Sequence, residues 1–224
     1  MVRAVAHLLG DLRDEVAFLG GAVVGLLVTD PAAREPRPTQ DVDVVVELAT
    51  KREYDSLEER LRELGFQNVM EGPICRFRHG DHLLDVMPTS EEVLGFGNPW
   101  YSEALAEAVE MDLGEGVSGR VITAPYFLAT KLAAFDSPHR EGHRDLVASR
   151  DFEDVVTVVD GRQAVVYEVA RSRPGLKAYL AERIRYLQGL RAFEEGVAAH
   201  LDIDEASQSR VAFVLERLGS IAGD

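Results

Sequence analysis

The chain has 224 residues, of which 46% are hydrophobic and 28% are charged, and its formal net charge is −15. This length allows one large domain or two small ones with a real core, and no apolar run approaches the roughly 20 residues that a membrane span needs. The negative charge argues against broad, sequence-independent binding to nucleic acid, which relies on basic surfaces that displace counterions from phosphates.

The N-terminal half alternates predicted helices and strands. Apolar residues from Val5 to Leu19 recur at helical spacing, which predicts a helix over residues 4–19 that ends at Gly20-Gly21. Three prolines mark residues 29–40 as a loop. The following segments are predicted as a strand over 42–48, a helix over 54–64 ended by Gly65, a β-hairpin with strands 74–78 and 82–87, an irregular stretch over 88–102 and a strand over 120–123.

The C-terminal half is predicted to be helical. Pro125 suits the first turn of a helix that runs to Phe135, and an irregular stretch over 136–149 follows it, with His139, Arg140, His143 and Arg144. Further helices are predicted near residues 151–160, 163–171, 175–200 and 204–218. We therefore expect an α/β (α+β) fold with a mixed β-sheet flanked by helices over 1–124, and a helical domain over 125–224 that completes a ligand cleft.

Paired carboxylates are the first candidate site. Asp41 and Asp43 lie two apart at the start of a predicted strand, so both project from one face. Carboxylates that close repel unless a cation or a proton lies between them, and Mg²⁺ or Mn²⁺ prefers such oxygen ligands. Asp85 stands in an otherwise apolar strand segment and is the candidate third ligand. An Asp-x-Asp pattern on a strand is also common on solvent-facing edges, where it has no function.

A wider pattern favours the functional interpretation. Gly20-Gly21, an apolar segment, a polar loop and Asp41-Val42-Asp43 on a valine-rich strand resemble the signature of the DNA polymerase β-type nucleotidyltransferase superfamily. The resemblance implies a nucleotidyltransferase fold, an Mg²⁺ site at Asp41, Asp43 and Asp85, and a nucleotide-binding role for Gly20, Gly21 and Thr39. The interval from Gly21 to Asp41 is longer than in the tightest versions of the motif. Glycine is also the usual stop of a helix, and both roles are compatible.

A downstream segment resembles one branch of that superfamily. Residues 125–132 and 149–155 are similar to the AbiEii-like nucleotidyltransferases, which include toxins of type IV toxin–antitoxin systems. The resemblance implies that Lys131 meets the nucleotide phosphates, that Asp151 supports catalysis and that Asp154 is its alternative. It also implies a tRNA or protein acceptor and a cognate antitoxin. Taken alone, Lys131 suits a solvated position and Asp151 suits the first turn of a helix.

The expected activity is transfer of NMP from an NTP, ATP included, to an acceptor hydroxyl on tRNA, protein or a small molecule. Three alternatives stay open: a catalytically silent nucleotide-binding module, a nucleotide-sugar glycosyltransferase that uses Asp-x-Asp, and a helical interaction protein. His139 and His143 are a weaker candidate for zinc, because no cysteine or ordered acid pattern completes their site. The single cysteine, Cys75, excludes an internal disulfide, and the N-terminus lacks signal-peptide character, so a cytoplasmic location is expected.

Overall fold

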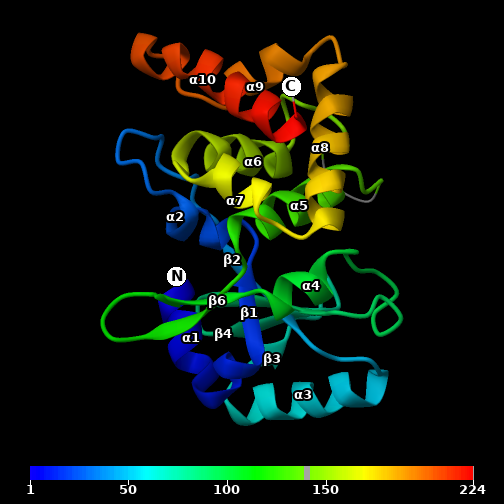
Figure 1. Cartoon of the computed structure of the whole chain (residues 1–224). Coiled ribbons are helices and arrows are strands. Elements are labelled where there is room, and N and C mark those ends of the chain that lie inside the picture. The colour runs from blue at the N-terminus through cyan, green and yellow to red at the C-terminus, as the bar shows by residue number, and fades with distance from the viewer. Residues whose placement is uncertain (139–141, 224) are drawn as a thin grey trace. The chain divides into compact units, whose positions relative to one another are not determined.

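A computed structural model describes residues 1–138 and 142–223 (Figure 1). The chain folds into two compact units. The first unit contains Met1–Val23 and Arg37–Thr123, and the second contains Val24–Pro36 together with the residues from Ala124 onward. The second unit therefore takes a short segment from the N-terminal half of the chain.

The first unit is built on one mixed seven-stranded sheet, in the order β3-β4-β5-β2-β1-β7-β6. At its centre, β2 runs parallel to β5 and antiparallel to β1, and β1 runs parallel to β7. The strands are β1 (Val16–Leu19), β2 (Asp41–Val46), β3 (Gln67–Asn68), β4 (Arg76–His79), β5 (His82–Pro88), β6 (Val109–Asp112) and β7 (Ser118–Val121).

Short helices accompany this sheet. They are α1 (Val2–Leu9), α3 (Lys51–Glu63) and α4 (Tyr101–Ala106), with 3₁₀ turns η1 (Gly10–Glu15) and η2 (Gly21–Val23). Helix α3 begins with a capping box, in which the Thr50 side chain accepts from the Glu53 N–H and the Glu53 carboxylate accepts from the Thr50 N–H. The buried Tyr54 joins α3 to the sheet, since its hydroxyl donates to the Val86 carbonyl at 3.4 Å.

The strand β1 corrects a sequence prediction. Residues 4–19 were expected as one helix, but α1 ends at Leu9, and Val16–Leu19 form a fully buried strand. Gly10 adopts φ +54, a conformation that ends the helix at little cost for glycine. Strand β1 then gains two neighbours, β2 and β7, and this tertiary pairing overrides the helical spacing.

The β-hairpin is confirmed. Strands β4 and β5 are joined by Gly80 and Asp81, and His79 pairs with His82 beside that turn. The strand β2 is confirmed as well, and all four of its valines are buried. Helix α4 and strand β6 were not predicted, because neither has a long periodic pattern.

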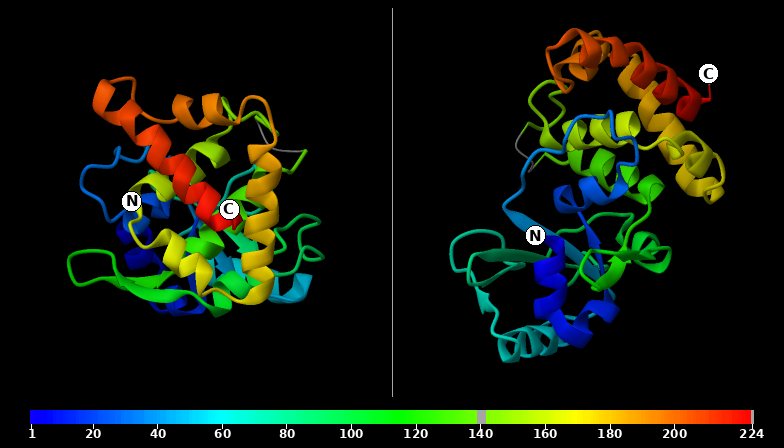
Figure 2. Two further views of the ribbon diagram at one scale, coloured as in Figure 1. Left: turned by 45° about the horizontal axis from the view of Figure 1, so that its top comes forward. Right: turned by 90° about the vertical axis from the view of Figure 1, so that its left-hand side faces the viewer.

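The second unit is helical. Its elements are α2 (Val24–Leu27), α5 (Ala124–Phe135), α6 (Arg150–Gly161), α7 (Val165–Ala170), α8 (Pro174–Gln188), α9 (Phe193–Ala199) and α10 (Glu205–Ala222). The predicted helix over 175–200 is wrong in one respect, since it is divided between α8 and α9. Helix α10 packs against α8 and α6 (Figures 1 and 2). These two units give the expected mixed α/β class.

Residues 24–36 join this helical unit through backbone contacts. The N–H groups of Thr29 and Asp30 both donate to the Gly161 carbonyl at 2.8 Å. A Cβ on Gly161 would lie 2.8 Å from a methyl group of Val28, so this close packing requires glycine. In the described residues, no helix is both long and apolar enough to cross a membrane.

Candidate active site

Two of the candidate metal ligands are neighbours across the sheet of the first unit. Asp43 on β2 and Asp85 on β5 are register partners in a parallel pair, so both project from one face. Asp41 precedes Asp43 by two residues and projects from the same face. Asp85 is buried, whereas Asp41 and Asp43 are partly exposed. The structure thus places the three carboxylates on one face, around the point where β2 begins.

An arginine bridges two of these acids. Arg76 on β4 is the register partner of Asp85, and its Nε and Nη2 donate to the two Asp85 oxygens, each at 2.7 Å. Its Nη2 also donates to Asp41 Oδ2 at 2.6 Å. A bidentate contact of this kind is among the strongest ion pairs in proteins. The Asp85 hydrogen bonds hold the pKa of Arg76 above its usual range, so the guanidinium keeps its charge.

The chemistry of the acids fits a cation. Within residues 1–138 and 142–223, no group of three or more His, Cys, Asp or Glu side chains is arranged to hold a metal ion. The positive charge between Asp41 and Asp85 is instead the Arg76 guanidinium. Asp43 lies beside Asp85 in the register of the two strands and makes interactions of its own. Arg76 therefore occupies both oxygens of Asp85, and a cation bound there would have to displace its guanidinium.

Gly20 fits closely against Asp43. Gly20 has φ +72, and a Cβ built on it would lie 1.9 Å from Asp43 Oδ2. Real Cβ atoms do not approach an oxygen so closely, so only glycine is accommodated here without a shift of Asp43. The Gly20 backbone and the acid pair therefore form one tightly fitted structure.

Replacing Gly20 by alanine should displace Asp43. We expect a loss of roughly 2–4 kcal/mol, from overpacking and from the left-handed backbone together. Gly80→Ala is the matched control, because Gly80 has φ +57 but nothing within 4 Å of its built Cβ. Urea denaturation measures the free energy of unfolding of both variants. The loss in Gly80→Ala reports the left-handed backbone alone, and the additional loss in Gly20→Ala reports the overpacking against Asp43. Equal losses in the two variants would contradict a specific contact between Gly20 and Asp43.

The other two proposed nucleotide-binding residues of the first unit flank this structure. Gly21 begins the 3₁₀ turn η2 that follows Gly20. Thr39 lies in the loop before β2, and its hydroxyl donates to the Asp41 carbonyl at 3.3 Å. Thr39 therefore supports the backbone from which the first acid projects.

Lys131, Asp151 and Asp154 form a separate buried cluster in the helical unit. Lys131 Nζ on α5 lies 3.0 Å from Asp151 Oδ1 and 2.7 Å from Asp154 Oδ2, both on α6. These residues are only 8%, 7% and 2% exposed, so the solvated alternative for Lys131 is wrong. Ser149 caps α6 by accepting from the Phe152 N–H, which puts Asp151 in its first turn.

Sequence reasoning missed the role of Arg76, although the signal was present. A two-residue turn at Gly80-Asp81 fixes the hairpin register, and counting back from His79 and His82 pairs Arg76 with Asp85. Its neighbour Cys75 is buried, and burial raises the pKa of the Cys75 thiol to about 12, so the thiol stays protonated. The zinc candidate falls partly on His139, which lies outside the described residues.

No protein-family model and no curated protein matches the sequence. Among solved structures, a proposed nucleotidyltransferase from Helicobacter pylori has a TM-score of 0.50 at 14% identity, covering 99% of this chain and 90% of that one. An antigenic nucleotidyltransferase-like protein from Paracoccidioides brasiliensis has a TM-score of 0.49 at 19% sequence identity. The match covers 88% of this chain and 90% of that one. JHP933 from Helicobacter pylori has a TM-score of 0.48 at 13% sequence identity, and the match covers 99% of this chain and 87% of that one. The first of these likenesses shows that this chain has a nucleotidyltransferase-like fold.

Proposed function

We propose that this chain is a metal-dependent nucleotidyltransferase that moves NMP from an NTP to an acceptor hydroxyl. The observation that carries the proposal is the placement of Asp43 beside Asp85, in register, against the backbone of Gly20. A carboxylate pair on one face of a sheet, next to a backbone that excludes any side chain, suits a cation and a polyphosphate. The fold likeness supports the same class.

The reaction forms one bond and breaks one. The acceptor oxygen bonds to the α-phosphorus of the NTP, the bond from that phosphorus to the α,β-bridging oxygen breaks, and pyrophosphate leaves. Asp41, Asp43 and Asp85 would hold Mg²⁺ or Mn²⁺, which supplies charge neutralisation on the phosphates. Asp85 also takes the proton of the acceptor hydroxyl as general base. Gly20, Gly21 and Thr39 position the nucleotide.

Lys131 has a proposed role of its own. Its ammonium offsets charge on the transferred or leaving phosphates. Asp151 and Asp154 already pair with this ammonium, so a phosphate would have to compete with two carboxylates for it. The contacts of Lys131 join α5 to α6 within the helical unit as well.

Arg76 competes with the cation for Asp85 and Asp41. Replacing Arg76 by glutamine should therefore increase the affinity for Mn²⁺ by about tenfold or more, because the bidentate contact to Asp85 no longer has to break. The affinity is measured by calorimetry with Mn²⁺ alone, without nucleotide. Arg78→Gln is the matched control, since Arg78 is an exposed arginine on the same strand. Unchanged or weaker Mn²⁺ binding in Arg76→Gln would contradict competition.

A second function receives support from the same arginine. With Asp41 and Asp85 satisfied by Arg76, the first unit is also compatible with a nucleotide-binding module that has no turnover. A transferase releases pyrophosphate, whereas a silent nucleotide-binding module does not. Calorimetry that detects NTP binding, together with no release of pyrophosphate in the presence of acceptors, would favour the silent module over the transferase.

The AbiEii-like resemblance suggests the acceptor classes to test. Three pools are incubated with the full chain, Mg²⁺ and each α-labelled NTP: total tRNA, cellular protein and small metabolites. We propose a toxin that labels tRNA or protein and is neutralised by a cognate antitoxin. Label confined to small molecules would reject the toxin while leaving nucleotidyl transfer intact. No label in any pool would reject both.

A further inference from the structure

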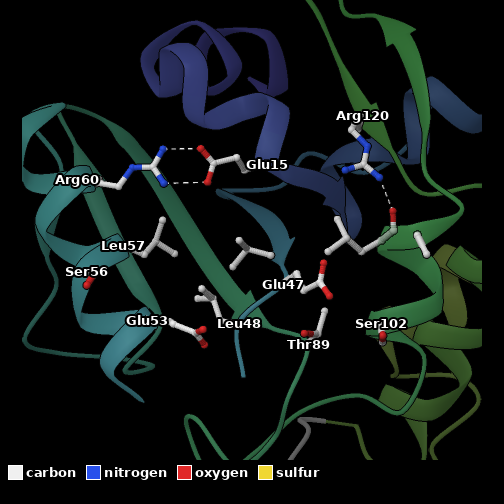
Figure 3. A pocket seen from close by; sticks show the side chains of 13 residues that line it. Glu15, Glu47, Leu48, Glu53, Ser56, Leu57, Arg60, Thr89, Ser102 and Arg120 are labelled. Atoms are coloured by element: carbon white, nitrogen blue, oxygen red, sulfur yellow. Dashed lines mark hydrogen bonds and ion pairs between the residues drawn. The ribbon is translucent and has the colours of Figure 1, made fainter. Parts of the chain in front are cut away.

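The first unit contains a pocket of about 620 Å³ that involves none of the proposed catalytic residues (Figure 3). It lies past the carboxyl ends of β2 and β5, where Val46, Glu47 and Thr89 line it. The Thr89 N–H donates to the Val46 carbonyl at 3.0 Å and holds these two strand ends together. Asp41 begins β2, so the pocket and the acid pair belong to opposite ends of that strand. The region outside the carboxyl ends of parallel strands is a recurrent place for ligands.

Part of the charge in this pocket is already neutralised. Arg60 on α3 makes a bidentate pair with Glu15, at 2.8 Å and 2.5 Å, and Figure 3 shows this pair on one side of the pocket. The Glu15 contact raises the pKa of Arg60 and lowers the pKa of Glu15. Glu53 accepts the N–H groups of Ala49 and Thr50, which cap α3. The charges of Arg60, Glu15 and Glu53 are therefore already engaged by other groups of the protein.

Two charged side chains of the pocket, Arg120 and Glu47, remain available to a ligand. Arg120 on β7 is half-buried, and the structure records one contact of its guanidinium, from Nη2 to the Leu105 carbonyl. In the described part of the chain, no carboxylate pairs with Arg120, and no cation pairs with Glu47. An arginine has five N–H donors, so most of its hydrogen-bonding capacity is unused. The Thr89 and Ser102 hydroxyls, which also line the pocket, likewise have no side-chain partner among the described residues.

Apart from Ser56, whose hydroxyl donates to the Arg52 carbonyl, the rest of the lining is apolar. Its apolar residues are Val46, Leu48, Leu57, Leu105 and Ala106. A pocket of this volume with an apolar surface and a few polar groups is typical of small-molecule sites. The polar groups not already used within the protein are one cation, one anion and two hydroxyls, which together select a ligand that carries both charges.

We propose that this pocket binds a free α-amino acid with an apolar side chain. The ligand carboxylate accepts from Arg120 in the bidentate geometry that a guanidinium favours. The ligand ammonium donates to Glu47 and to the hydroxyls of Thr89 and Ser102. The apolar side chain packs on the leucines, which removes apolar surface from water. This ligand site is independent of the nucleotidyl-transfer proposal.

Calorimetry and thermal unfolding of the full chain with each of the protein amino acids test the proposal. At least one apolar amino acid should bind, and its N-acetyl and methyl-ester derivatives should bind at least tenfold more weakly, because each lacks one charge. Arg120→Gln and Glu47→Gln should each weaken binding by about tenfold or more, since each removes one charged contact. Arg120→Lys keeps the charge and should retain part of the affinity, which distinguishes a lost contact from misfolding.

Matched controls lie outside the pocket. Arg78→Gln and Glu63→Gln change exposed residues of the same unit and should leave amino-acid binding unchanged. Asp43→Asn should also leave it unchanged, which separates this site from the acid pair. Binding of no apolar amino acid overturns the proposal. So does binding that ignores Arg120 and Glu47, or binding that Asp43→Asn removes.

Discussion

Replacing Asp43 by asparagine is expected to lower the rate of nucleotide transfer by at least about 10²-fold, because one preorganised charge of this kind contributes about that much. Asparagine has nearly the same shape as aspartate, so it fits against Gly20 while it removes the charge that would hold a cation beside Asp85. Incorporation of α-labelled NMP into the responsive acceptor pool, with Mg²⁺, measures the effect.

The control for Asp43→Asn is Asp81→Asn. Asp81 is an exposed aspartate in the hairpin turn of the same unit, so its loss changes the net charge equally without touching the acid pair. Its activity should match that of the unmodified chain. Equal incorporation by Asp43→Asn and Asp81→Asn would remove Asp43 from the proposed catalytic residues.

Replacing Lys131 by methionine is expected to lower the free energy of unfolding by about 3–5 kcal/mol, the usual effect of breaking a buried ion pair. Methionine fills a similar volume but leaves Asp151 and Asp154 buried without their cation. Both carboxylates would then have to take up protons or open the contact between α5 and α6. Urea denaturation followed by circular dichroism measures the loss.

Lys177→Met is the control for Lys131→Met, because Lys177 is an exposed lysine on α8 of the same unit. It should change the free energy of unfolding by no more than about 0.5 kcal/mol. The double variant Lys131→Met/Asp154→Leu should recover part of the loss, since it removes one unpaired carboxylate. A stability unchanged in Lys131→Met would show that the cluster does not hold the helical unit together.

The parts of the fold with strong local signals could be predicted from sequence. The hairpin was predictable because Gly80-Asp81 leaves two residues between two apolar runs, and this turn length also fixes the register. The strand β2 was predictable because valines follow a proline-rich loop. These elements bring Asp43 and Asp85 to one face, so the central part of the candidate site was within reach of sequence reasoning.

Other parts of the structure depend on tertiary contacts that local sequence patterns do not reveal. Val16–Leu19 continue the helical spacing of the preceding residues, yet they form a strand because β2 and β7 bury them on both edges. The association of residues 24–36 with the helical unit depends on the Gly161 carbonyl, more than 120 residues away. The contacts of Arg76 with Asp41 and of Lys131 with two aspartates depend on rotamers, which spacing alone does not determine.

Nucleotides labelled on either the α- or the γ-phosphorus distinguish nucleotidyl transfer from other reactions of an NTP. The full chain, Mg²⁺ and the acceptor pools are incubated in parallel with each label, and the acceptor and the released phosphates are separated. For nucleotidyl transfer we expect α-label to enter the acceptor while γ-label leaves as pyrophosphate, one equivalent for each NMP transferred. Entry of γ-label into the acceptor, or release of γ-label without any transfer of α-label, would contradict it.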